Sequence, residues 1–540
     1  MWDSAYRERL WSAITQPWDL LVIGGGISGA GVLRQASLAG LNCLLVEATD
    51  FSSGTSSRSS KLVHGGFRYM RSRQFDVTRE SVRERDWLLR TVPGLVTPLP
   101  FVMPNYQSYH TPAWQFRLGV ALYDLFGMKW KHQSYSARQA AELVPQLNPN
   151  GLEAAFLYED AAVDDSRLVL RVLQEAMQSG AHALNYARVE CLLRDRLGQV
   201  CGALVRDTSR PDGPMVEVHA GVVIQATGPW TDELRQTLGA APRIRQTRGS
   251  HLIFQRSRLP LQQAVTLMHP VDKRAMFAIP WEGVCLVGTT DLDHRQTGAE
   301  PFTSQEEMDY ILEVIQAILP GCEISARDIM GSMSGVRPIV TSGAADPSAE
   351  SRAHAVLEEH GLFSIAGGKL TTFRVMADST LQAAHSHFSG RSFSHSRQTM
   401  FSPLKPVHVP AGLSPRQVGY LAGRHGANLP ALFDCPEEEL SPIASLPNLW
   451  AELRLAARSE SVLHLDDLLL RRVRLGLQLP AGGQDCLPRI QSIVQSELGW
   501  SNSRWNQEAE RYLRIWQNYY SPHPGEVPQE AEITAVSLTV

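Results

Sequence analysis

The segment that most constrains the fold of this chain runs from Asp19 to Asp50 and reads DLLVIGGGISGAGVLRQASLAGLNCLLVEATD. Its apolar run Leu20–Ile23 predicts a buried parallel strand, and a helical pattern follows from about Ile27 to Ala39. The glycines of the intervening turn have the GxGxxG spacing of a dinucleotide-binding motif: Gly24, Gly26 and Gly29. The first permits a tight turn, the second lets a pyrophosphate approach the backbone, and the third lets helix and strand pack closely. We therefore expect phosphates to bind at the N-terminus of this helix.

A second predicted strand, Asn42–Val46, brings an acidic residue to the same place. Glu47 follows it directly and lies 23 positions after Gly24, close to the ~20 expected for the acid that binds a ribose. Because a carboxylate there would repel a 2′-phosphate, the sequence disfavours NADP.

Three later segments favour FAD over NAD. Gly54–Met70, GTSSRSSKLVHGGFRYM, is a polar loop where a NAD dehydrogenase would continue to alternate helix and strand. Val222–Gly228, VVIQATG, predicts a buried strand that ends in a glycine turn, and Phe363–Phe373, FSIAGGKLTTF, predicts another that opens a helix. There Gly367 and Gly368 would let backbone N–H groups approach an anionic ring edge, which suits a reduced flavin.

Family-specific motifs extend from about residue 18 to residue 375. They are IGGGISGAG, GTSSRSSKLVHGGFRYM, VDDSRLVL at 163–170, ATGPW at 226–230, RGSHL at 248–252, DKRAMFAIPW at 272–281, GTTD at 288–291, SGVRP at 334–338 and GGKLTT at 367–372. With these motifs the chain resembles the FAD-dependent glycerol-3-phosphate dehydrogenases of the aerobic, quinone-linked type. After about residue 400 the likeness thins to RRVRL at 471–475, where a threonine would be more usual than Val473.

The resemblance implies an α/β architecture in which the domains interleave. An FAD-binding Rossmann-like domain of the glutathione-reductase and D-amino-acid-oxidase type would comprise residues 18–75, 155–235 and 350–385. A mixed-sheet substrate domain would comprise 76–154 and 236–349, and would roof the reactive edge of the flavin. A Ser/Pro-rich stretch, Ser386–Pro415, predicts a linker to a helical C-terminal domain at about 400–520.

The resemblance also implies the residues that bind FAD. Besides the glycines of the first motif and Glu47, they are Thr55, Ser56, Ser57, Ser60, Lys61, Leu62, His64, Gly228, Gly367, Gly368, Lys369, Leu370 and Thr371.

The substrate implied by the resemblance is glycerol 3-phosphate, which is small and carries nearly two negative charges. Its binding must come from charge-assisted hydrogen bonds, for which the planar guanidinium is well suited. Five candidates lie inside family-like motifs: Arg68, Tyr69, Arg274, Arg337 and Lys369. We expect one or two of them to act only as supports.

Oxidation of a secondary alcohol sends a hydride to the flavin and requires an acceptor for the hydroxyl proton. His64 is a candidate because histidine changes charge near neutral pH, and a contact with the flavin without proton transfer is an equal alternative. His251 is a second candidate for the base. Arg337 is too weak an acid to serve as the base, but it could steer the alkoxide.

Three functions are compatible with these features. The first is a glycerol-3-phosphate dehydrogenase that passes electrons to a membrane quinone. The second is a flavin oxidase that uses oxygen and acts on glycerol 3-phosphate or on another small hydroxy or amino acid. The third is a non-catalytic flavin-bound scaffold. The set of cations favours a phosphate dianion over a single carboxylate and makes the scaffold improbable.

Composition constrains partners and location. A net charge of −4 and a pI near 6.5 give no case for nucleic-acid binding. The seven cysteines lack CxxC spacing, which favours a reduced, cytoplasmic setting. We expect no metal, because the linker histidines His385, His387 and His395 lack other ligands at suitable spacing. A homodimer is among the expected assemblies.

A quinone acceptor requires contact with the membrane, and no segment approaches the ~20 apolar residues of a span. We therefore expect a peripheral protein on the cytoplasmic face of the inner or plasma membrane. One candidate surface is the N-terminal pattern of Trp2, Tyr6 and Trp11, for which packing against the sheet is favoured. The other is Pro112–Trp130, for which a buried amphipathic helix is favoured.

Overall fold

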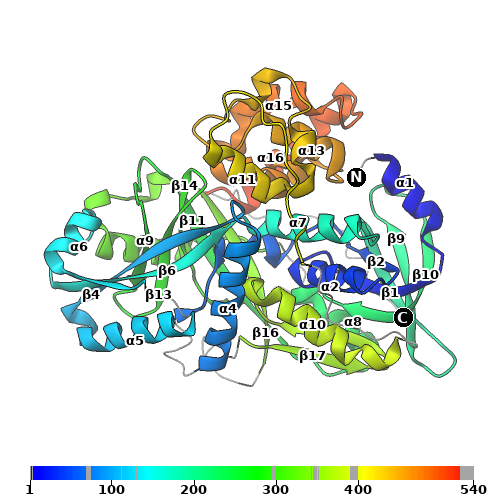
Figure 1. The fold of residues 1–540 in the computed structure, drawn as a ribbon, viewed down its shortest axis with the longest axis horizontal. Helices are drawn as coiled ribbons and strands as arrows, with labels where there is room; N and C mark the ends of the chain where they lie inside the picture. The colour runs from blue at the N-terminus through cyan, green and yellow to red at the C-terminus, as the bar shows by residue number, and fades with distance from the viewer. Residues whose placement is uncertain are drawn as a thin grey trace.

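Two sheets, each assembled from distant parts of the chain, form the body of the molecule (Figure 1). The computed structural model describes residues 2, 4–67, 74–110, 112–127, 131–294, 300–341, 343, 350, 352–388 and 399–522. The first sheet lies on the right of Figure 1 and the second on the left, and helices from the C-terminal part lie above their junction.

The first sheet contains the strand of the glycine-rich motif. Its strands are β1 (Trp18–Ile23), β2 (Cys43–Val46), β7 (His182–Leu184), β8 (Ala187–Arg194), β9 (Val200–Asp207), β10 (Met215–Gln225), β17 (His354–Glu359) and β18 (Leu362–Gly367). The order is β17-β18-β10-β1-β2-β7, with β8 and β9 joined to β10 as antiparallel strands. The strands β18, β10, β1, β2 and β7 run parallel, as buried apolar runs of this kind predict.

The two faces of this sheet are buried against different layers. Val22 and its neighbours on one face pack in a core with three helices, α2 (Ile27–Leu38), α7 (Asp165–Gln178) and α10 (Phe373–Ala383). Leu21 faces the other way, into a core that includes Leu10, Ile14 and residues of β8 and β9. This two-residue alternation explains why the strands are apolar throughout.

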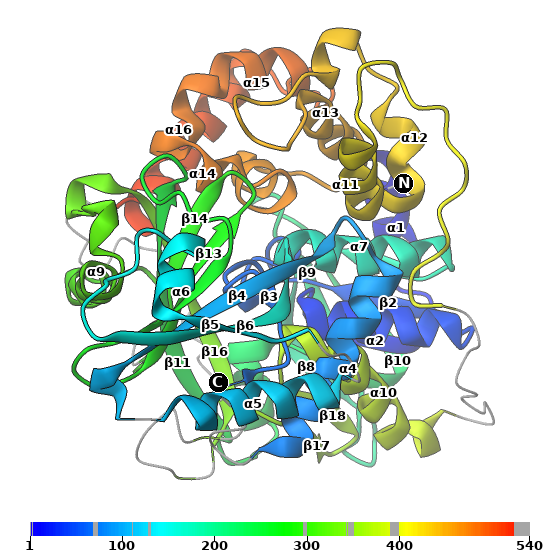
Figure 2. The ribbon, with the colours of Figure 1, turned by 60° about the vertical axis from the view of Figure 1, so that its left-hand side comes forward.

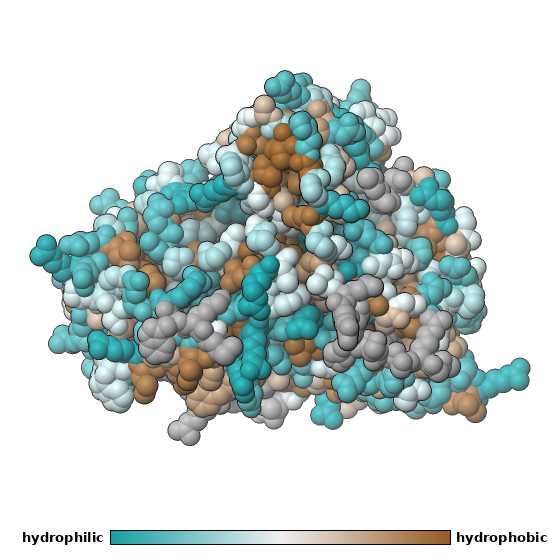
Figure 3. All heavy atoms as spheres, in the orientation of Figure 1, coloured by the Kyte–Doolittle hydropathy of each residue, from teal (hydrophilic) through white to brown (hydrophobic). Residues whose placement is uncertain are grey.

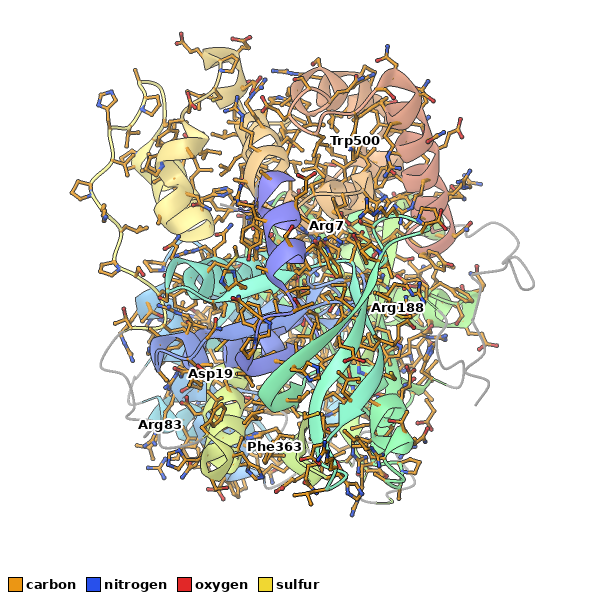
Figure 4. The ribbon with its side chains drawn as sticks, turned by 90° about the vertical axis from the view of Figure 1, so that its right-hand side faces the viewer. Arg7, Asp19, Arg83, Arg188, Phe363 and Trp500 are labelled. Atoms are coloured by element: carbon orange, nitrogen blue, oxygen red, sulfur yellow. The ribbon has the colours of Figure 1, made fainter. Side chains whose placement is uncertain are left out.

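The N-terminal helix, α1 (Ser4–Ala13), packs on the body of the molecule (Figure 4). Arg7 donates hydrogen bonds to the carbonyl of Asn185 (2.6 Å) and the carboxylate of Asp207 (2.5 Å). Trp2, just before the helix, is buried and stacks on Phe51 with ring centroids 4.9 Å apart. The expectation that the N-terminal aromatics pack internally is therefore confirmed.

The second sheet is mixed, with a parallel pair among antiparallel ones, and lies beside the first. Its strands are β3 (Leu62–Val63), β4 (Val96–Tyr106), β5 (Gln133–Ser136), β6 (Leu152–Val163), β11 (Ile244–Gln255), β12 (Ala264–Met268), β13 (Ala275–Trp281), β14 (Val284–Gly288), β15 (Leu292–Asp293) and β16 (Ile329–Val340). The order is β15-β11-β14-β13-β12-β4-β6-β3, with β16 paired to β11 and β5 to β6. The helices near it are α4 (Phe75–Thr91), α5 (Ala113–Phe126), α6 (Ala137–Leu143) and α9 (Gln305–Ile318), and a short helix α8 (Thr231–Thr237) follows β10.

The division between the two sheets differs from the expected domain boundaries at residues 75 and 155. β3 pairs antiparallel with β6, so Leu62 and Val63 belong to the second sheet although they lie within the range expected for the FAD domain. β6 continues to Val163, well past residue 155, because it pairs with β4 over its whole length. The chain re-enters the first domain only at α7.

The helix α5 has one buried side and one exposed side. Val120 and Tyr123 are buried beneath it, whereas Trp114, Leu118 and Leu125 are 63, 63 and 61% exposed. The amphipathic helix expected within Pro112–Trp130 is present as α5, and its inward side is buried as expected. Its outer side is exposed and carries large apolar residues, so the membrane contact stays a prediction. Residues 128–130 lie outside the described part of the chain.

A helical domain follows the linker and covers the top of both sheets (Figure 2). Its α-helices are α11 (Pro415–His425), α12 (Leu429–Leu432), α13 (Trp450–Ser459), α14 (Leu475–Gln478), α15 (Leu487–Val494) and α16 (Asn502–Tyr519). Its apolar residues share a core with strands β4, β6 and β13 of the second sheet. The predicted fold class is confirmed: a Rossmann-like α/β sheet, an interleaved mixed sheet and a helical C-terminal domain.

Candidate active site

The glycine-rich turn has the geometry that the sequence motif predicts. Gly24 has a φ of +111°, its N–H donates to the carbonyl of Val46 (2.8 Å), and a Cβ there would lie 2.6 Å from the carbonyl oxygen of Ala226. A Cβ on Gly29 would lie 1.9 Å from the carbonyl oxygen of Gly24. A side chain at Gly24 would push the turn away from the end of β10, and one at Gly29 would push α2 away from the turn.

Gly26 differs from these two glycines, because the space beside it is open to a ligand. It is the N-cap residue of α2 and provides no side-chain cap, so the first N–H groups of the helix are capped by other groups. A Cβ on Gly26 would meet the protein only at Ser56 Oγ, 3.0 Å away. A helix N-terminus with open space beside its N-cap residue and a polar loop next to it fits the pyrophosphate of a dinucleotide.

Glu47 lies at the end of β2, beside this turn. Its carboxylate accepts hydrogen bonds from the N–H groups of Gly25 (2.7 Å) and Thr49 (2.9 Å). Burial raises the pKa of this carboxyl above its ordinary value, against the lowering effect of these hydrogen bonds. Oε1 also accepts from the hydroxyl of Thr49 (3.2 Å), so Oε2 is the oxygen that can accept from a ribose hydroxyl.

The serine-rich loop, Ser52–Ser60, joins the first motif to the second sheet. Ser56 Oγ accepts from the N–H of Ile27 (3.0 Å), and Thr55 Oγ1 donates to the carbonyl of Val336 in β16 (2.5 Å). Ser57 is buried and its hydroxyl donates to Gly54 (3.4 Å). The loop is thus fixed from both sheets, while Thr55, Ser56 and Ser60 remain partly exposed.

Lys61 differs from its expected role as a cofactor ligand. The residue is 0% exposed, and its ammonium donates to Asp165 (2.8 Å) and to the carbonyl of Ser57 (2.6 Å). Burial lowers its pKa to about 8, with a smaller lowering from Arg474 and a raising effect from Asp165. The side chain therefore forms an internal ion pair, enclosed also by Met333 and the ring of Trp281. Leu62 beside it is also buried, in β3.

The third motif forms a glycine turn at the end of β18. Gly367 and Gly368 have φ values of +71° and +86°, and a Cβ on Gly368 would lie 2.4 Å from the sulfur of Met376. Leu370 and Thr371 follow in a single helical turn before α10. Thr371 Oγ1 accepts from the backbone N–H of His64 at 3.3 Å, which joins this turn to the serine-rich loop. Gly228, at the end of β10, has a φ of +60° and a free space beside its Cα.

Two of the predicted substrate arginines meet at one carboxylate. Arg274 lies 2.9 Å and Arg337 3.1 Å from Asp291, and a third guanidinium, that of Arg352, lies 3.2 Å from it. The three arginines hold the pKa of Asp291 far below its ordinary value, more than offsetting the effect of burial. The carboxylate is 1% exposed, whereas Arg274 and Arg337 are 19 and 24% exposed. This arginine cluster (Arg274, Arg337, Arg352) can therefore bind an anion on its exposed side, while the buried carboxylate of Asp291 holds the three guanidiniums in place.

The other predicted substrate residues lie elsewhere. The ammonium of Lys369 points to α4, where it donates to Ser81 Oγ and to the carbonyl of Val77 (3.4 Å). Arg68 and Tyr69 lie outside the described residues. Sequence reasoning missed Arg352, which stands in no motif and is brought to the cluster because β17 pairs with the end of β18.

His251 connects the arginine cluster to the serine-rich loop. Its Nε2 lies 2.9 Å from Ser60 Oγ, and its Nδ1 is buried without a hydrogen-bond partner in the described part of the chain. Burial, with smaller contributions from the charges of Arg337 and Lys61, lowers the pKa of His251 to about 3. The imidazole is therefore neutral at physiological pH.

The chain is similar to two protein families and to several known proteins over most of its length. Residues 19–374 match the model of the FAD dependent oxidoreductases, and residues 365–505 match that of the C-terminal domain of alpha-glycerophosphate oxidase. It is 35% identical to glycerol-3-phosphate dehydrogenase 2 of Mycobacterium tuberculosis, over 94% of this chain and 90% of that protein. It is 32% identical to the aerobic glycerol-3-phosphate dehydrogenase of Bacillus subtilis, over 87% of this chain and 89% of that protein.

A solved structure extends this similarity to the fold. The glycerol-3-phosphate dehydrogenase of Bacillus halodurans, complexed with FAD, superposes with a TM-score of 0.76 at 26% identity, covering 97% of this chain and 99% of that one. FAD is accordingly the cofactor of this chain, and the open space beside Gly26, the carboxylate of Glu47 and the third glycine motif fit it.

Proposed function

The chain belongs to the family of FAD-dependent glycerol-3-phosphate dehydrogenases, and from this we propose that it oxidises sn-glycerol 3-phosphate to dihydroxyacetone phosphate and passes the electrons to a membrane quinone. The assignment of the substrate rests on the arginine cluster. Three guanidiniums converge on the one carboxylate of Asp291, which leaves an excess of positive charge at this partly exposed contact. A phosphate monoester with nearly two negative charges matches that excess, whereas an amino acid with one carboxylate does not.

The arginine cluster can orient the substrate because its own geometry is fixed. Arg337 Nη2 also donates to Thr289 Oγ1 (2.8 Å), and Arg274 Nε lies 3.4 Å from the carbonyl of Thr289. Since the guanidiniums are held before the substrate arrives, little side-chain entropy is lost on binding.

FAD, when bound, supplies the hydride acceptor and the means to pass electrons onward. The chain itself must accept the hydroxyl proton, and we assign this role to His64. It lies half-buried where β3 approaches the turn that contains Thr371, between two motifs of the FAD site. His251 is a weaker base because an imidazolium with a pKa of about 3 does not retain a proton near neutral pH. Its neutral ring instead fixes the hydroxyl of Ser60 (2.9 Å).

The outer face of α5 is our proposed membrane contact. Trp114, Leu118 and Leu125 are spaced so that they lie along one side of the helix, and Figure 3 shows hydrophobic residues gathered over it at the lower left. Phe75, at the start of the neighbouring α4, is also 44% exposed. In the described part of the chain no helix could span a bilayer. Peripheral attachment at the cytoplasmic face of the membrane fits both observations.

The inner face of α5 lies next to the loop that carries His64. A Cβ on Gly65 would lie 2.3 Å from Tyr123 Oη, and a Cβ on Gly119 would lie 3.1 Å from the ring of Phe67. A quinone that reaches α5 from the bilayer would therefore be close to the proposed flavin site. This proximity favours a quinone over a diffusing oxidant as the electron acceptor.

The proposal is tested by letting the flavin be reduced by glycerol 3-phosphate without oxygen and then offering a soluble quinone or oxygen separately. We expect the quinone to reoxidise the flavin much faster than oxygen does. Fast reoxidation by oxygen and slow reoxidation by quinone would instead identify an oxidase.

A further inference from the structure

Three arginines of one short segment reach from the C-terminal domain into the base of the serine-rich loop. Arg471 and Arg472 end a π-helical turn (Asp467–Arg472), and Arg474 follows with a φ of +64°. Their side chains are 7, 0 and 1% exposed. Such large charged groups are rarely buried unless they are paired.

Arg474 pairs with the carboxylate that also holds Lys61. Its Nη1 lies 2.9 Å from Asp165 Oδ1, and its Nη2 donates to the carbonyl of Ser57 at 2.7 Å. Asp165 in turn accepts from the backbone N–H and the hydroxyl of Ser59 (3.0 and 2.7 Å). One arginine of the C-terminal domain thus fixes the centre of the loop, both directly and through Asp165.

Arg471 and Arg472 fix the beginning of the same loop. Both bind Asp50, at 2.5 and 2.6 Å, shortly after the end of β2 and Glu47. Asp50 also accepts from the side-chain amide of Asn185 (3.0 Å). The loop between Asp50 and Lys61 is therefore held at its start and at its centre by the same C-terminal segment.

We propose that Arg474 is a positioning residue for FAD, and that the C-terminal domain completes the cofactor site by holding the serine-rich loop in its binding conformation. The loop is rich in serine and has few apolar anchors, so its order depends on these buried polar contacts. Without Arg474, the Ser57 carbonyl loses one of its two donors and Asp165 loses one of its two cations. This inference concerns FAD binding only and does not depend on the substrate or on the electron acceptor.

The test measures FAD affinity in the full-length apoprotein, by titration of flavin fluorescence. Arg474→Gln is expected to weaken FAD binding by roughly tenfold or more, since a charge-assisted contact in a buried site is lost. Amide exchange of residues 50–62 in the same apoprotein should become faster. The FAD affinity of Arg474→Lys should lie between those of the wild type and Arg474→Gln, because lysine keeps the charge but cannot present two fixed N–H groups.

Arg424 provides a matched control from the same domain. It is 0% exposed and binds Asp164 (3.0 Å), Glu282 (2.9 Å) and Glu452 (3.3 Å), none of which lies in the loop. It shares Asp164 with Arg474 (3.1 Å), so the two variants differ in the contacts with Asp165 and Ser57 that only Arg474 makes. Arg424→Gln should lower the thermal stability while leaving FAD affinity and loop exchange unchanged.

Equal losses of FAD affinity in Arg474→Gln and Arg424→Gln would overturn the proposal, because domain docking in general would then explain both. Unchanged affinity or unchanged loop exchange in Arg474→Gln would overturn it as well. If Arg474→Gln does not fold, Arg474→Lys compared with Arg424→Lys decides the question by the same two measurements.

Discussion

Arg337 Nη1 lies 3.1 Å from Asp291 Oδ1, so a partly exposed guanidinium on β16 is fixed by a carboxylate that is itself hidden from solvent. Arg274 and Arg352 approach the same carboxylate from other strands and loops. Anion binding at this site therefore depends on side chains that are far apart in the sequence.

Arg274→Ala and Arg337→Ala should each lower kcat/KM for glycerol 3-phosphate by on the order of tenfold to a thousandfold, about 1.4–4 kcal/mol, as expected for charge-assisted contacts in a shielded site. FAD content should not change. Steady-state kinetics with each variant provide the measurement. Arg258→Ala is the control, because Arg258 pairs with Asp328 on the surface of the same domain. Wild-type kinetics in both cluster variants would exclude this anion site.

Gly26→Val should give a folded but colourless protein. A side chain at this position would fill the open space at the N-terminus of α2 that we assign to the pyrophosphate. The wild type should be yellow, with non-covalent FAD that is released on denaturation. Absorbance at the flavin maximum, before and after acid precipitation, makes the comparison. Gly419→Ala, where nothing lies within 4 Å of the added Cβ, is the control. A yellow Gly26→Val variant would refute the assignment.

His64→Gln should slow flavin reduction most strongly on the alkaline side of the pH profile and should flatten its acidic limb, because the neutral imidazole is the proton acceptor. Stopped-flow reduction across the pH range measures this. A variant whose profile runs parallel to that of the wild type, only lower, would support a contact with the flavin without proton transfer.

His251 should make the wild type sensitive to acid. Its pKa is about 3 in the folded protein and about 6.5 in the unfolded chain, so between these values only the unfolded chain binds the proton. Stability is therefore lost as the pH falls below about 6.5, by about 1.4 kcal/mol per pH unit from this group. Thermal unfolding of apoprotein at pH 5–8 should show that the stability advantage of the wild type over His251→Gln shrinks with falling pH. A pH-independent difference would mean that the buried imidazole is not neutral.

Trp114→Asp and Leu118→Asp should weaken binding to liposomes containing anionic lipid. Charged groups on the outer face of α5 would have to enter the interface. Leu197→Asp is the control, because Leu197 is 84% exposed on a different domain. Sedimentation with vesicles gives the bound fraction. Equal binding by all three variants and the wild type would remove α5 from the membrane contact.

The sequence predicted the parts of the site that depend on local geometry. Gly24 and Gly29 have conformations or close contacts that only glycine permits, and such constraints appear as spacing in one stretch of chain. The two sheets were also predictable in kind, because buried parallel strands are apolar throughout.

The parts that depend on tertiary contacts were not predictable. Lys61 lies in a flavin-loop motif, yet its ammonium is enclosed by Asp165 and Ser57 because Arg474 closes the loop from another domain. Arg352 belongs to the arginine cluster only through strand pairing at the sheet edge. No local sequence pattern indicates the contacts of either Lys61 or Arg352.

The central claim is that this chain reduces its FAD with glycerol 3-phosphate, bound through the arginine cluster. The most direct test is anaerobic mixing of the holoprotein with glycerol 3-phosphate or with glycerol, followed at the flavin absorbance maximum. Glycerol 3-phosphate should bleach the wild-type flavin rapidly, glycerol should not, and Arg337→Ala should bleach far more slowly at the same substrate concentration. Equal bleaching by both compounds, or none by glycerol 3-phosphate, would contradict the account.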